Sequence, residues 1–135
     1  MMILRFLFSA AAFVAATYSL SAYSSPDKII PEPVEYSVSE GFHNLKGDGS
    51  DIKVYLSDAE FASKIKDLPS FAQEEAYRLV VGRKGVRIYA KTEEGAFRAA
   101  QCLEMMRLID RDIQFCDIFD YPRFQHRGIM LDESR

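Results

Sequence analysis

The fold is decided by residues 75–106, EAYRLVVGRKGVRIYAKTEEGAFRAAQCLEMM. Apolar side chains alternate with other residues on both sides of a short glycine-flanked turn at residues 82–85. The alternating apolar positions are Tyr77, Leu79, Val81, Val86, Ile88 and Ala90. This period of two predicts an antiparallel hairpin with one buried face, whose other face carries Arg78 and Arg87.

The second half of this stretch has the spacing of a helix. Thr92 can cap a helix that begins at Glu93. The expected buried stripe consists of Ala96, Ala99, Ala100, Leu103 and Met106. Because alanine adds little bulk, this helix can lie close to a sheet. Glu94 and Arg98 have the spacing of an ion pair on its outer face.

Upstream of residue 75, the sequence predicts further strands. Residues 34–38 and 41–45 have the pattern of a short first hairpin, and residues 52–56 that of a half-buried strand. His43 falls in a polar, glycine-rich setting and is expected to be an exposed loop histidine. We expect no catalytic role for it.

A second helix is expected after residue 56. Ser57 and Glu60 fit a capping box, in which the serine accepts from the backbone and the glutamate reaches back. The apolar residues Phe61, Ile65 and Leu68 follow on one helical face, and Pro69 ends the helix.

Downstream of residue 106, the pattern changes twice. Residues 112–117 predict one further edge strand, and residues 117–123 predict a linker. Residues 129–131 are a dense apolar run, Ile-Met-Leu, typical of a strand buried on both faces in a parallel sheet or barrel. Such a strand needs partners, so we expect a barrel to begin here.

The first 24 residues have the layout of a secretory signal peptide. One basic residue, Arg5, precedes the apolar run of residues 6–20, and small residues follow. A lone transmembrane anchor is the alternative, but the run is short for a membrane span. We expect export to the periplasm or the cell exterior, with no stable membrane span.

Composition excludes several other functions. The net charge is −3, and the basic residues are scattered instead of forming a stripe, so nucleic acid is not expected as a partner. Cys102 and Cys116 could form a disulfide in an oxidising compartment, but we favour two buried small hydrophobic residues. With only His43 and His126 besides, no zinc-type spacing exists, and we expect no metal and no cofactor.

Three segments of the chain resemble the family 20 glycoside hydrolases, which remove terminal N-acetylhexosamines. They are residues 29–36 (IIPEPVEY), residues 75–106, in which Gly95 opens the helix, and residues 120–135 (DYPRFQHRGIMLDESR). The resemblance implies an N-terminal α+β domain at residues 25–119, an antiparallel sheet with two helices on one face. It also implies a linker and the first strand of a truncated (β/α)8 barrel at residues 120–135.

The resemblance also implies a reaction and one site residue. In this family the substrate's own 2-acetamido group attacks the anomeric carbon, while an adjacent Asp-Glu pair orients that group and supplies the general acid. Asp132 and Glu133 lie in the first-strand motif instead of the later catalytic motif, so we assign no catalytic residue. Arg135 matches the arginine that grips sugar hydroxyls, whereas Arg127 is interpreted as structural and Arg123 as part of the domain junction.

Two function classes follow. The first is an N-terminal fragment of a secreted β-N-acetylhexosaminidase, inactive alone, whose full-length form acts on glycans that end in N-acetylhexosamine. The alternative is a non-catalytic secreted module that binds glycan or protein. That module would need an exposed aromatic platform, for which the candidates are Tyr77, Tyr89, Phe97 and Tyr121. We favour the first class, because the aromatic candidates fall mostly where the core or the domain junction would claim them.

Overall fold

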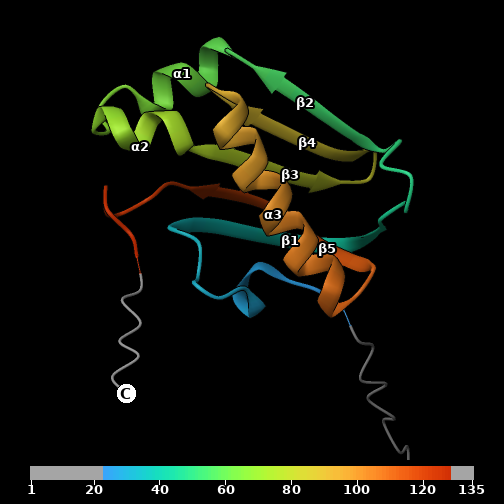
Figure 1. Cartoon of the computed structure of the whole chain (residues 1–135). Helices are drawn as coiled ribbons and strands as arrows, with labels where there is room; N and C mark the ends of the chain where they lie inside the picture. Colours follow the sequence, from blue (N-terminus) through green and yellow to red (C-terminus); the bar gives the residue numbers. More distant parts are fainter. Residues whose placement is uncertain (1–22, 129–135) are drawn as a thin grey trace, which may run out of the picture.

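A computed structural model describes residues 23–128 (Figure 1). Helices and strands follow one another as η1 Pro26–Lys28, β1 Glu35–Asn44, β2 Ile52–Leu56, α1 Ala59–Ile65, α2 Ser70–Glu75, β3 Tyr77–Gly82, β4 Gly85–Ala90, α3 Glu93–Ile109 and β5 Asp112–Asp120. The fold is α+β, as expected. The expected barrel strand at residues 129–131 lies outside the described residues.

The strands form one five-stranded sheet in the order β1-β5-β3-β4-β2. The hairpin of β3 and β4 is confirmed, with Gly82 opposite Gly85 at the turn. The expectation of an all-antiparallel sheet was wrong, because β2 runs parallel to β4. Parallel pairing requires a crossover connection, which α1, α2 and β3 supply between β2 and β4.

Strand β1 corrects the prediction of a first hairpin at residues 34–45. Both of its halves pair with the same strand, β5, and the register shifts between Val38 and Phe42. Gly41 lies at this bulge with a φ of +114°, and a Cβ there would lie 2.4 Å from the Phe115 ring. The glycine therefore marks a bulge in one strand and not the turn of a hairpin.

Strand β5 was expected at an edge and is instead an inner strand. It pairs with β1 on one side and with β3 on the other. Its Asp117 has a partner on the neighbouring strand β3, because it accepts hydrogen bonds from the Arg78 guanidinium at 2.7 to 3.2 Å. This contact lets a charged side chain occupy an inner strand.

Helices lie against both faces of the sheet, so the expectation of two helices on one face was wrong. Helix α3 covers the face that carries Leu79, Ile88 and Ile118 (Figure 1). Helix α1 packs its Phe61 against Phe119, which lies on the opposite face because neighbouring residues of a strand alternate. The short α2 was not expected; it begins directly after Pro69.

The caps and buried stripes differ in detail from the prediction. Thr92 caps α3 as expected, but its buried residues are Gly95, Ala99, Cys102, Leu103 and Met106, whereas Ala100 is exposed. Asp58, not Ser57, caps α1 by accepting from the Phe61 amide at 2.9 Å. Ser57 instead has a φ of 61°. The capping-box prediction was therefore wrong by one residue.

Cys102 and Cys116 are both free and buried, which confirms their interpretation as small core residues. Burial raises the pKa of the Cys102 thiol to about 11 and that of Cys116 to about 12. Thiols held protonated in this way are poor nucleophiles.

The first turn of helix α3 lies so close to the end of α2 that only glycine fits at residue 95. A Cβ there would lie 2.5 Å from the Ala76 carbonyl oxygen. We predict that Gly95→Ala lowers the free energy of unfolding by at least about 1 kcal/mol, although alanine is the better helix former. Urea unfolding of the variant measures this change.

The matched control is Gly82→Ala, because a Cβ at Gly82 would meet no atom within 4 Å. It should change the free energy of unfolding by no more than about 0.5 kcal/mol. A stabilised Gly95→Ala variant would contradict the close approach.

Candidate functional site

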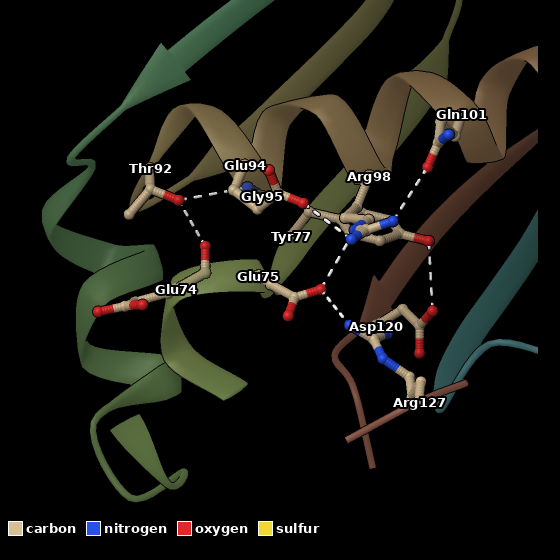
Figure 2. A network of polar contacts seen from close by, with 10 residues as sticks. All are labelled: Glu74, Glu75, Tyr77, Thr92, Glu94, Gly95, Arg98, Gln101, Asp120 and Arg127. Atoms are coloured by element: carbon tan, nitrogen blue, oxygen red, sulfur yellow. Dashed lines mark hydrogen bonds and ion pairs between the residues drawn. The ribbon is translucent and has the colours of Figure 1, made fainter. Parts of the chain in front are cut away.

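A pocket of about 340 Å³ lies where β3 begins and β5 ends. Its lining includes Glu75 at the end of α2, Arg98 on α3 and the chain that leaves the sheet at residues 121–127. These segments are far apart in sequence, and strand pairing brings them together, because Tyr77 is opposite Asp120 in the sheet. Figure 2 shows the polar residues of this junction.

Asp120 connects three parts of the chain. Its carboxylate accepts from the Val34 amide at 3.2 Å and from the Tyr77 hydroxyl at 3.3 Å. Burial raises the pKa of the Asp120 carboxyl above its ordinary value, and burial also raises the pKa of Tyr77. The lead-in to β1, the start of β3 and the end of β5 are therefore joined by one carboxyl group.

Glu75 holds two arginines. Its Oε2 accepts from Arg98 Nε at 3.1 Å and also contacts the guanidinium of Arg127 (Figure 2). Arg98 is itself held by Glu94 at 2.8 Å, which confirms the ion pair expected from the sequence. The outgoing chain is thus tied through Arg127 to the end of α2 and the first turns of α3.

The outer face of α3 carries an exposed apolar stripe beside this pocket. The apolar residues of this stripe have helical spacing, and the polar Gln101 and Glu104 lie among them: the stripe is formed by Phe97, Ala100, Met105 and Leu108. Exposed fractions are 54% for Phe97, 38% for Met105 and 72% for Leu108. Gln101 joins the stripe to the pocket by accepting from Arg98 at 3.4 Å.

The structure places some of the residues singled out in the sequence and not others. Arg123 and Arg127 line the pocket, whereas Asp132, Glu133 and Arg135 lie outside the described residues. Of the four aromatic candidates, Tyr77 is buried, Tyr89 and Tyr121 are half-buried, and Phe97 is exposed. They do not form a continuous exposed platform.

The sequence reading missed two polar arrangements. Asp120 and Glu75 were not recognised as site residues, because only the paired strands bring them to Tyr77 and Arg98. His43 is a strand residue and not an exposed loop histidine: its Nε2 lies 2.6 Å from Asp51 Oδ2. Burial alone would raise the pKa of Asp51, but hydrogen bonds from His43 and the Lys46 amide lower it.

Metal binding and membrane spanning can be examined in the described residues as well. Across residues 23–128, no three His, Cys, Asp or Glu side chains gather as metal ligands would. In the same part of the chain, no helix has both the length and the apolar character needed to cross a membrane.

The buried Asp120 predicts a pH dependence. Because its folded pKa is raised, the folded state keeps this proton to a higher pH than the unfolded chain does. The stability that protonated Asp120 contributes is present below about pH 4 and is lost as the pH rises through the folded pKa. Asp120→Asn cannot ionise, so its stability relative to the parent protein should increase between about pH 4 and 7 in urea unfolding.

Asp48→Asn is the control with the opposite sign. Hydrogen bonding to Ser50 lowers the pKa of Asp48, so removing this carboxylate should cost stability above about pH 4 instead of adding it. A stability difference for Asp120→Asn that stays constant or falls with pH would contradict the buried carboxyl.

The comparisons with known proteins agree on one family. Residues 45–121 match glycosyl hydrolase family 20, domain 2. The chain is 39% identical over 72 residues to β-hexosaminidase A of Caenorhabditis briggsae and 32% identical over 77 residues to β-hexosaminidase subunit beta of Mus musculus. These alignments cover 50% and 54% of the chain but only 13% and 14% of the relatives.

Solved structures share the fold. A family 20 exo-β-N-acetylglucosaminidase from Vibrio harveyi, in complex with N-acetylglucosamine, aligns with a TM-score of 0.52 and 20% identity, over 80% of this chain and 21% of that one. A chitobiase from Flavobacterium johnsoniae aligns with a TM-score of 0.50 and 20% identity, over 77% and 22%. With the match to residues 45–121, the chain belongs to glycosyl hydrolase family 20.

Proposed function

We propose that this chain is the N-terminal part of a secreted β-N-acetylhexosaminidase that releases terminal N-acetylhexosamines from glycans. The observation that carries the proposal is the family match over residues 45–121, which form most of the described domain. Retaining, substrate-assisted hydrolysis is the reaction we propose for the longer enzyme. Periplasmic or extracellular localisation belongs to the same proposal and is supported by the apolar segment at residues 6–20.

The described domain would support catalysis without taking part in it. The reaction needs one carboxylate to orient the acetamido group and one acid to protonate the leaving oxygen. The pocket carboxylates Glu75 and Asp120 are engaged by Arg98, Arg127 and Tyr77. Both therefore have structural partners, and we place the catalytic pair in the barrel that follows.

The α3 stripe is the surface on which we place that barrel. Phe97, Met105 and Leu108 are exposed together on one face of α3. Apolar side chains grouped in this way often mark interaction sites, whereas single exposed ones do not. Arg127 holds the outgoing chain beside α3, so a domain that follows begins next to the stripe. The matched segment is only 13% to 14% of each relative, and the remaining length is enough for such a domain.

A non-catalytic glycan-binding module is the weaker candidate. Sugar platforms use exposed aromatic faces, but Tyr89 is stacked on Tyr55 at 5.1 Å between ring centroids, and Tyr77 is buried. Only Phe97 of the four candidates is well exposed, and it belongs to the α3 stripe.

The first test of the function is turnover. The 135-residue chain should not hydrolyse a chromogenic N-acetyl-β-glucosaminide, whereas the same chain extended along its reading frame into a barrel should do so. In the extended enzyme, Arg135→Lys should lower kcat/KM at least about tenfold, because lysine keeps the charge but loses the planar fork. An inactive extended chain that folds, or turnover by the 135-residue chain, would contradict the proposal.

The second test concerns the α3 stripe. Leu108→Asp should lower the free energy of unfolding of the extended enzyme by about 2 kcal/mol or more, since the charge would be buried at the domain contact. In the 135-residue chain the same change should have little effect, because Leu108 is exposed there. Thermal unfolding of both chains measures the difference.

The control is Val38→Asp, at a residue of β1 that is 48% exposed and lies outside the stripe. It should affect the two chains alike. Equal effects of Leu108→Asp on both chains would place the barrel elsewhere.

A further inference from the structure

Tyr23 and Ser24, the last two residues of the expected signal peptide, belong to the described domain, and Ser24 pairs with the sheet. Ser24 donates its amide hydrogen to the Asp112 carbonyl at 2.9 Å, and its carbonyl accepts from the Gln114 amide at 2.8 Å. It forms a parallel bridge with Ile113. Strand β3 pairs with β5 only from Cys116 to Asp120, so Ser24 fills the side of β5 that β3 leaves open.

The neighbours of Ser24 are fixed as well. Ser24 and Ser25 are both buried, and Pro26 is fully buried at the start of η1. Tyr23 packs its ring on Phe42, with 5.3 Å between the centroids, and Lys28 Nζ lies 4.1 Å above the Tyr23 ring. The structural domain therefore begins at Tyr23 or earlier.

The sequence offers two places for a signal peptidase, which requires small residues at the first and third positions before the cut. One is Ser19-Leu20-Ser21, and the other is Ala22-Tyr23-Ser24. The boundary expected from the sequence, after residue 24, uses the second. Cleavage there would remove the two backbone hydrogen bonds of Ser24 and leave a charged amino group on the buried Ser25. A buried unpaired charge is costly.

We propose that the exported chain is cleaved between Ser21 and Ala22, so that Tyr23–Lys28 stay in the mature domain. Water adds across this peptide bond under catalysis by a signal peptidase. Ser21 leaves with the leader as a carboxylate, and Ala22 becomes the new amino terminus. The proposal rests on the export proposed above and revises its boundary by three residues. It makes the segment after the leader a structural part of the sheet.

Two variants distinguish the two cleavage sites without touching a described residue. Ser19→Gln places a bulky residue three positions before the proposed cut and leaves the other site intact. Ala22→Gln does the reverse, because residue 22 is the third position before a cut after Ser24 and follows the proposed cut. Both variants are made in the full chain with a C-terminal tag and expressed in a secreting host.

Intact mass and N-terminal sequencing give the outcome. The parent chain and Ala22→Gln should both be cut after Ser21, and Ser19→Gln should lose that cut, so that it either keeps its leader or is cut after Ser24 at the site left intact. A mature parent chain that begins at Ser25, or processing blocked by Ala22→Gln and not by Ser19→Gln, would overturn the site. An unprocessed parent chain would overturn export itself. Turnover by the extended enzyme is measured separately, so failure of the hexosaminidase proposal remains distinguishable.

Discussion

Pairing along both sides of β5 is the interaction on which the rest of the domain depends. The strand bonds to both halves of β1 on one side, and to β3 and Ser24 on the other. Among the described residues it is also the last strand of the sheet, and it is the partner strand of both β1 and Ser24, so these early segments join the sheet only when residues 112–120 are in place. Because these pairings join residues far apart in the sequence, the sheet depends on residues 112–120, which contain three aspartates.

The same pairing creates the junction pocket. Tyr77 at the start of β3 is opposite Asp120 at the end of β5, so the tyrosine hydroxyl can donate a hydrogen bond to the aspartate carboxyl group. The chain then turns past α3, where Glu75 holds both Arg98 and Arg127. The exit of the chain is thus fixed by the sheet, by α2 and by α3 together. A domain with a fixed exit next to an apolar helix face is suited to hold a second domain in one orientation.

Local patterns predicted the parts of the fold that depend on local interactions. The β3–β4 hairpin follows from alternation, and the start of α3 follows from Thr92 and from the spacing of Glu94 and Arg98. Non-local pairing explains the errors. Gly41 resembled a turn, but the Phe115 ring across the sheet makes it a bulge.

The candidate site was predictable only in part, for the same reason. The spacing of Glu94 and Arg98 is visible within one helix. The contact of Glu75 with Arg127 joins residues 52 positions apart, and that of Tyr77 with Asp120 joins residues 43 apart. The spacing of residues within one helix or strand does not predict contacts between residues so far apart in the sequence. The hydrogen bond of Asp117 with Arg78 likewise joins residues on two different strands.

Amide hydrogen exchange in the 135-residue chain tests the central position of β5 most directly. The amides of β5 that bond to β3, within residues 116–120, should exchange only through global unfolding and show the full dependence on denaturant. The amides of the edge strand β2 that point away from β4 should exchange far faster. If the β5 amides exchange as fast as those exposed edge amides, with no dependence on denaturant, then β5 is not the inner strand and this account of the domain is wrong.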